Sequence, residues 1–180
     1  GYANRAVSIA TINGSTLPSK FRFSAQIGYS LMDVIDWLEA PVVSQGYMVF
    51  DFKSKSDFKY ARMVVTRWGT SSSAWKYTYK CVIGKFVGTV DTPLAVTPGC
   101  KIVDHRTGPL VYNATVEGDG STIRLFIDGE LEVSHTFGAA PNGIAGVGAA
   151  TTDWATITRK SAGTAWVRSK FDNLSLEEIV

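Results

Sequence analysis

This sequence has little net charge and no long apolar stretch. The 180 residues carry a net charge of +2 and 19% charged side chains, with no run of five like charges. A charge this close to neutral gives no electrostatic footprint for nucleic acid or an anionic membrane. No apolar stretch approaches the roughly 18 residues needed to cross a bilayer, and residues 1–10 lack the apolar centre of a signal peptide. We therefore expect neither nucleic-acid binding nor membrane insertion.

Cysteine and histidine are equally scarce, with two of each. The sequence has no Cys-x-x-Cys pair, and His105 and His135 stand at unrelated spacings, which argues against a zinc site. A disulfide between Cys81 and Cys100 would stabilise the fold by about 3 kcal/mol in an oxidising compartment. The alternative is two separate thiols, one of them buried on a strand. The sequence alone leaves both alternatives open.

The clearest pattern in the sequence is a strand signal between Tyr47 and Thr66 (YMVFDFKSKSDFKYARMVVT). Apolar and polar residues alternate in both halves around a polar turn, which predicts a β-hairpin. The alternation assigns the first arm to two faces, with Met48 and Phe50 on one and Tyr47, Val49 and Asp51 on the other. Asp51 and Asp57 bracket the turn, and we interpret both as its caps.

The same period of two recurs along most of the chain and predicts about a dozen short strands. In the segment 21–27 we expect Phe21, Phe23, Ala25 and Ile27 to face inward. Gly84 is expected to turn the chain between strands at 75–83 and 85–90, and Asp128-Gly129 to form a type I′ hairpin turn. The other strands are predicted at 7–12, 102–103, 110–116, 122–127, 130–134, 144–149 and 165–176. One or two helical turns, carried on a long loop, are predicted only at 31–38.

This pattern predicts an all-β protein, either a sandwich or a barrel, and a jelly roll would protect its many strand edges. Hydrophobic residues make up 45% of the sequence, and a chain of this length can bury a sizeable core without cross-links. We interpret residues 1–180 as a single domain. Because residue 1 is glycine rather than methionine, we expect the domain to be excised from a larger protein.

Five segments in this order resemble the concanavalin A-like, laminin G-like jelly-roll domains of large bacterial surface and secreted proteins. They are FRFSAQI at 21–27, the hairpin at 47–61, IRLFIDG at 123–129, IAGVG at 144–148 and FDNLSL at 171–176. The resemblance covers most of the chain and implies an all-β fold of two curved antiparallel sheets packed as a β-sandwich, with a concave face and loops at its rim. It also implies an extracellular or cell-surface location. The segments 31–45 and 151–163 depart from the family pattern.

Relatives with this fold include carbohydrate-binding modules, lectins, glycoside hydrolases, polysaccharide lyases and non-catalytic spacers. Hydrolysis needs two facing carboxylates, but Asp33, Asp36 and Glu39 have a helical spacing. The Gln-x-His motif of the lyases is also absent. The sequence therefore favours a non-catalytic carbohydrate-binding, lectin-like module. A structural or adhesive domain without a small ligand and a polysaccharide hydrolase or lyase are the alternatives.

Sugar binding needs flat aromatic faces beside a few fixed hydrogen-bond donors. Trp37 and Trp154 stand in predicted loops and are candidate stacking residues, although each could instead pack beneath its loop. Tyr60 and Arg62 share one face of the second hairpin arm. If that face is concave, we expect both to contact a polysaccharide or other glycan; if it is convex, they are ordinary surface residues.

A structural calcium ion is implied by the resemblance alone. Relatives often hold calcium near the chain ends with an aspartate of the last strand, and Asp172 in Phe171-Asp172-Asn173 matches that position. Oxygen ligands suit calcium. The alternative is that Asp172 pairs with a lysine or arginine, or accepts a hydrogen bond from a backbone N–H.

Overall fold

The computed structural model describes residues 7–12, 14, 16–31, 42–68, 76–98, 101–103, 110–151 and 167–180. These residues form twelve strands. In chain order the strands are β1 (Val7–Thr11), β2 (Lys20–Leu31), β3 (Val42–Ser54), β4 (Asp57–Trp68), β5 (Lys76–Val87), β6 (Val90–Val96), β7 (Lys101–Val103), β8 (Leu110–Asp119), β9 (Thr122–Ile127), β10 (Glu130–Thr136), β11 (Ile144–Thr151) and β12 (Val167–Glu178). In the described part of the chain, no helix is long and apolar enough to span a bilayer.

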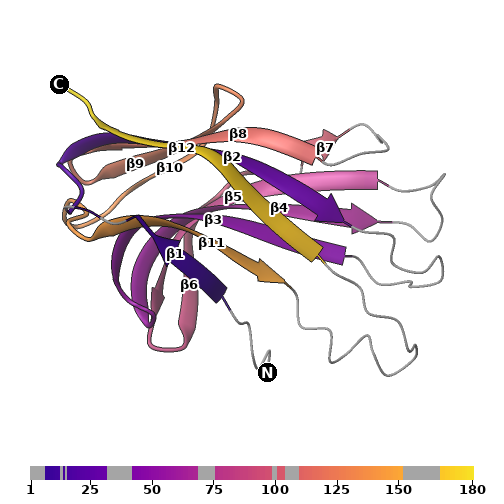
Figure 1. Ribbon diagram of the computed structural model, residues 1–180, viewed down its shortest axis with the longest axis horizontal. Helices are drawn as coiled ribbons and strands as arrows, with labels where there is room; N and C mark the ends of the chain where they lie inside the picture. The colour runs from indigo at the N-terminus through magenta and orange to yellow at the C-terminus, as the bar shows by residue number, and fades with distance from the viewer. Residues whose placement is uncertain are drawn as a thin grey trace.

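The strands form two antiparallel sheets that pack face to face, which confirms the predicted β-sandwich (Figure 1). The seven-stranded sheet has the order β1-β11-β3-β4-β5-β6, with β7 also paired to β5. The five-stranded sheet has the order β10-β9-β8-β2-β12. Sequence neighbours such as β3, β4 and β5 pair directly, whereas β11 and β12 join strands far away in the chain, as in a jelly roll.

The main core lies between the two sheets, and alternation along each strand builds it. On β2, the four residues expected to face inward, Phe21, Phe23, Ala25 and Ile27, are all buried. From the seven-stranded sheet the core receives Met48, Phe50, Ala61, Met63, Cys81 and Ile83. Cys81 has a free thiol, and Cys100 lies outside the described residues. Burial raises the pKa of the Cys81 thiol to about 12.

The turn between β9 and β10 follows the predicted chemistry. Asp128 has φ 50° and Gly129 has φ 84°, and a type I′ turn needs positive φ at both central residues. Three residues after Gly129, a bulge at Glu132 interrupts the pairing of β10 with β9 and turns this side chain into the sandwich. Its Oε1 accepts hydrogen bonds from Lys101 Nζ at 2.5 Å and Tyr79 Oη at 3.0 Å, so Glu132 ties β10 to β5 and β7.

The prediction for Gly84 was wrong. β5 continues through Gly84 to Val87, and the turn falls at Gly88, which has φ 64°. A glycine is needed at this position inside the strand because the phenol ring of Tyr60 on β4 covers it. A Cβ here would overlap the phenol oxygen and lie 2.7 Å from the Thr92 carbonyl oxygen. After this turn the edge strand β6 covers residues 90–96, where no strand was predicted beyond residue 90.

The predicted role and facing of Asp51 were also wrong. The pairing of β3 with β4 shifts between Val49 and Asp51, so Phe50 occupies a β-bulge and the faces exchange beyond it. Asp51 points to the same side as the inter-sheet core, is 2% exposed, and accepts hydrogen bonds from the backbone N–H of Gly143 at 2.6 Å and from Lys59 Nζ at 2.5 Å. It anchors the 142–143 segment instead of capping a turn.

Candidate functional site

The face of the seven-stranded sheet that is turned away from the five-stranded sheet holds a second hydrophobic cluster. Its buried members come only from the seven-stranded sheet and are Tyr47, Val49, Phe58, Tyr60, Val82 and Ala150. In Figure 1 the strands bend away from the five-stranded sheet at the end where the β3–β4 and β5–β6 turns lie. This face is therefore the inner side of the bend, and we call it the concave face.

Cross-strand pairing arranges aromatic rings in a row across the concave face. Phe52 on β3 is paired with Phe58 on β4, and Phe58 with Phe86 on β5. The rings stack, with centroids 6.4 Å apart in the first pair and 5.1 Å in the second. Phe58 is buried between the other two, which are half-buried. The bulge at Phe50 creates this row, because it turns Phe52 onto the concave face.

Arg62 on β4 lies behind this aromatic row, between two tyrosine rings. Its guanidinium carbon is 5.0 Å from the ring centroid of Tyr60 and 5.5 Å from that of Tyr47. Arg62 Nη1 donates to Tyr47 Oη at 2.8 Å and to Asp91 Oδ2 at 2.7 Å. Burial alone would lower the pKa of Arg62, but attraction to Tyr47, Tyr60 and Asp91 outweighs it, and the pKa lies above its ordinary value. The guanidinium is therefore charged throughout the physiological range.

Tyr60 reaches across the neighbouring strand to the same carboxylate. Its hydroxyl donates to Asp91 Oδ1, and Gly84 leaves the room over β5 that the phenol needs to reach β6. Burial is the main reason that the pKa of Tyr60 is raised; Arg62 opposes the rise, and the hydrogen bond to Asp91 adds to it. One carboxylate on the edge strand thus orients both Tyr60 and Arg62.

The sequence predicted Tyr60 and Arg62 as neighbours, and the structure brings them together on the concave face. It also shows that Tyr60 is fully buried and that Arg62 is 7% exposed, so neither presents a large surface to solvent. Their role in ligand binding stays a prediction. Trp37 and Trp154, and the carboxylates Asp33, Asp36 and Glu39, lie outside the described residues.

Sequence reasoning missed Asp91, Phe52 and Phe86. Asp91 was assigned to no predicted strand, and Phe52 was assigned to no face. The signal that could have found Asp91 is Gly88-Thr89, a turn that places 90–92 opposite 85–87. All three reach solvent, as does Ile9 on β1: Phe52, Phe86 and Ile9 are half-buried, and the Asp91 side chain is 18% exposed. The concave face can therefore offer ring surface beside a fixed hydrogen-bond acceptor.

Asp172, the predicted calcium ligand, lies on β12 at the outer face of the five-stranded sheet. It is exposed, and its Oδ1 accepts a hydrogen bond from the backbone N–H of Asn173 at 2.8 Å. Asn173 has φ 52° in the bulge that follows. Among the residues that the structure describes, no group of three or more His, Cys, Asp or Glu side chains could hold a metal ion. Calcium binding through Asp172 stays a prediction.

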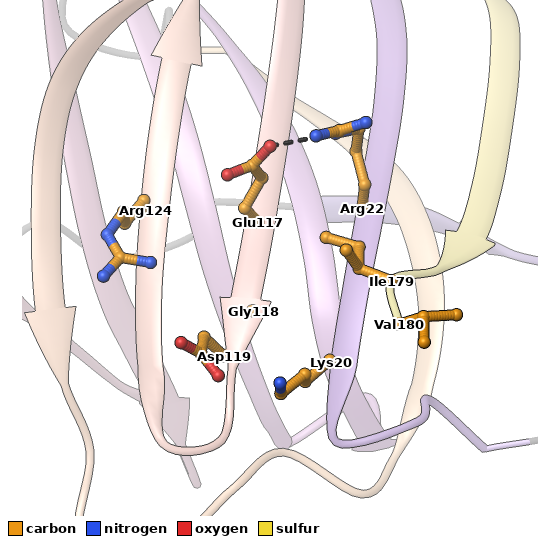
Figure 2. A pocket seen from close by; sticks show the side chains of 8 residues that line it. All are labelled: Lys20, Arg22, Glu117, Gly118, Asp119, Arg124, Ile179 and Val180. Atoms are coloured by element: carbon orange, nitrogen blue, oxygen red, sulfur yellow. Dashed lines mark hydrogen bonds and ion pairs between the residues drawn. The ribbon is translucent and has the colours of Figure 1, made fainter.

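A polar pocket of about 220 Å³ lies at one end of the five-stranded sheet (Figure 2). Charges of both signs line it, together with two apolar residues of the C-terminal segment: Lys20, Arg22, Glu117, Asp119, Arg124, Ile179 and Val180. Arg22 donates through Nε to Glu117 at 2.9 Å and through Nη1 to Glu177 at 3.1 Å. These exposed pairs contribute little to stability.

The chain was compared with known families and solved structures. No protein-family model and no curated protein matches the sequence. The carbohydrate-binding module CBM66 from Bacillus subtilis is similar in structure, with a TM-score of 0.58 and 14% sequence identity over 97% of this chain and 84% of that one. This likeness supports the jelly-roll fold. The β-porphyranase BpGH16B from the human gut bacterium Bacteroides plebeius has a TM-score of 0.35 and 8% identity over 96% of this chain and 68% of that one, too low to carry an argument.

Proposed function

We propose that this domain is a non-catalytic carbohydrate-binding module that holds a glycan on its concave face. The observation that carries the proposal is the row Phe52–Phe58–Phe86, which ends at the carboxylate of Asp91. The likeness to a structure whose printed name is a carbohydrate-binding module supports it as well. The proposal places the module in an extracellular or cell-surface protein, in agreement with the family that the sequence resembles.

The chemistry of sugar recognition suits this arrangement. A pyranose or furanose ring presents C–H groups on its faces and hydroxyl groups at its edge, so it is recognised by an aromatic surface and by fixed polar groups together. The exposed parts of Phe52 and Phe86 supply the surface. Asp91 supplies the fixed polar group, because Tyr60 and Arg62 hold its two oxygens in place.

The test is retardation of the protein in gels that contain soluble polysaccharides, followed by a glycan array. We expect Phe86→Ala and Phe52→Ala each to weaken the retardation clearly, since stacking on one ring is worth about 0.5–1.5 kcal/mol beyond the area it buries. Phe126→Ala is the matched control, because Phe126 is half-buried on the outer face of β9. Urea unfolding of each variant separates lost binding from lost stability. Equal retardation of all four proteins would exclude the concave face as the site.

A structural or adhesive role without a small ligand is the second candidate, and the burial of Tyr60 and Arg62 favours it. In that case their network only fastens the edge strand β6 to the sheet. Indifference of the wild-type protein to every glycan on the array would establish this candidate. Release of reducing ends or of unsaturated uronates from a bound polysaccharide would instead establish a hydrolase or lyase.

Calcium binding at the C-terminal strand is a separate part of the proposal. If Asp172 is a ligand, a chelator should lower the midpoint of thermal unfolding, and added calcium should restore it. Asp172→Asn should remove both responses. If neither chelator nor calcium changes the midpoint of thermal unfolding, calcium binding at Asp172 is excluded.

A further inference from the structure

The ion pair on the concave face has an inner and an outer member. Arg62 Nη1 and Asp91 Oδ2 are 2.7 Å apart, and the side chain of Arg62 is 8% exposed whereas that of Asp91 is 18% exposed. The partner that a ligand would meet is therefore the carboxylate. We propose that this face selects neutral, hydroxyl-rich glycans and rejects glycans that carry carboxylate or sulfate groups. This inference rests on the proposed function.

The positive charge of Arg62 is already matched inside the protein. Its guanidinium bonds to Asp91 and Tyr47 and lies against the rings of Tyr47 and Tyr60. Among the described residues, the three cross-strand rows that contain Phe86, Tyr60 and Arg62 hold no second cation, and the exposed Lys80 lies in the next row, where it pairs with Val64. An anionic ligand would have to compete with Asp91 for Arg62 in a buried position.

Asp91 can only accept hydrogen bonds when it is ionised, and sugar hydroxyl groups donate them. A carboxylate offers about four acceptor positions in all, and Tyr60 and Arg62 each donate one hydrogen bond to it. A ligand carboxylate or sulfate beside Asp91 would bring two negative charges together in a partly buried site, where like charges oppose binding strongly. Phe86, which is paired with Asp91 across β5 and β6, provides the adjacent stacking surface.

The experiment compares one polysaccharide with its own oxidised form, in which primary hydroxyl groups have become carboxylates. The polysaccharide is the neutral one that retards the wild-type protein most. Titration calorimetry should show binding weaker by roughly tenfold or more for the oxidised form. Because salt screens repulsion, higher salt should strengthen the residual binding of the oxidised form by the wild-type protein.

Substitution of the outer carboxylate tests its role directly. Asp91→Asn should bind the neutral form more weakly but reduce the discrimination to about threefold or less, because the repelling charge is gone. Asp119→Asn, in the pocket on the other sheet (Figure 2), is the matched control and should leave the ratio unchanged. If Asp91→Asn does not fold, the effect of salt on binding of the oxidised polysaccharide by the wild-type protein still tests the proposed selectivity.

The outcomes separate this inference from the proposed function. Equal or tighter binding of the oxidised form, or binding of that form that weakens with salt, overturns the neutral selectivity and leaves the carbohydrate-binding function standing. An equal change of the ratio in Asp119→Asn also overturns it. Failure of every glycan, neutral or charged, overturns the proposed function itself.

Discussion

Replacement of Asp51 by alanine is expected to destabilise the fold far more than the same change at Asp57. The two carboxylates flank one turn, and their sequence positions suggest equal roles. In the structure Asp57 is exposed, whereas Asp51 is 2% exposed and accepts three hydrogen bonds. The donors are the backbone N–H groups of Asn142 at 3.2 Å and Gly143 at 2.6 Å, and Lys59 Nζ at 2.5 Å.

The magnitude follows from what each donor loses. The N–H of Gly143 is buried, and a buried donor without a partner costs about 1–3 kcal/mol. Lys59 loses its ion-pair partner, but its side chain is 22% exposed, so it can turn to water and adds only about 1 kcal/mol. Asp51→Ala should therefore lower the free energy of unfolding by about 2–4 kcal/mol. Asp57→Ala should change it by less than about 0.5 kcal/mol.

Urea unfolding followed by tryptophan fluorescence measures both changes, with the slope checked for constancy. Asp51→Asn serves as an intermediate variant, because its amide oxygen still accepts from Gly143 while the charge opposite Lys59 is removed. We expect it to lose about 1–2 kcal/mol. Equal losses in Asp51→Ala and Asp57→Ala would refute the reasoning and return Asp51 to the role of a turn cap.

Three further perturbations test other parts of the structure. Gly84→Ala puts a Cβ against the phenol of Tyr60 and should cost about 1–3 kcal/mol in urea unfolding; an unchanged midpoint would show that the phenol does not need this space. Burial raises the pKa of Cys81 from 9.0 to about 12, so the folded state retains the thiol proton that the unfolded state loses. That stabilisation is complete below pH 9.0 and disappears as the pH rises toward about 12. The free energy of unfolding should therefore fall over this alkaline range, and Cys81→Ala should make the fall smaller. A thiol reagent at about pH 8 should label Cys81 only after unfolding. Glu132→Ala leaves Lys101 without its buried partner and should cost about 1–3 kcal/mol, with Glu132→Gln in between; a neutral effect would exclude the tie between the sheets.

Alternation in the sequence predicted most strand positions, because a strand with one buried face places an apolar residue at every second position. Phe21 to Ile27 is the clearest case. The two-sheet architecture came from the family resemblance. Bulges escaped prediction, because one extra residue reverses every side chain that follows it. The bulge at Phe50 sent Asp51 to the core side and Phe52 to the concave face. No local pattern records such a step, since it depends on the pairing partner.

The candidate site could be predicted only where its residues share a strand. Tyr60 and Arg62 are two positions apart on β4, so period two places them together. Asp91 meets them through the pairing of β4 with β5 and of β5 with β6, and that contact depends on the phenol of Tyr60 passing over Gly84. From the sequence Gly84 indicated a turn, because glycine is most often found where the chain reverses.

Burial on both faces of the seven-stranded sheet limits which variants can test function. The opposite faces of β3 and β4 contribute to different clusters, Met48 and Met63 to the main core and Tyr47 and Tyr60 to the concave face. Truncating a fully buried aromatic residue such as Tyr60 should cost about 3–5 kcal/mol, and the resulting loss of binding would be indistinguishable from loss of the fold. Phe86 is half-buried at the end of the row, so its truncation removes ring surface that faces solvent and leaves most of the packing. A loss of glycan retardation in Phe86→Ala without a comparable loss of stability would therefore be evidence for contact with the ligand.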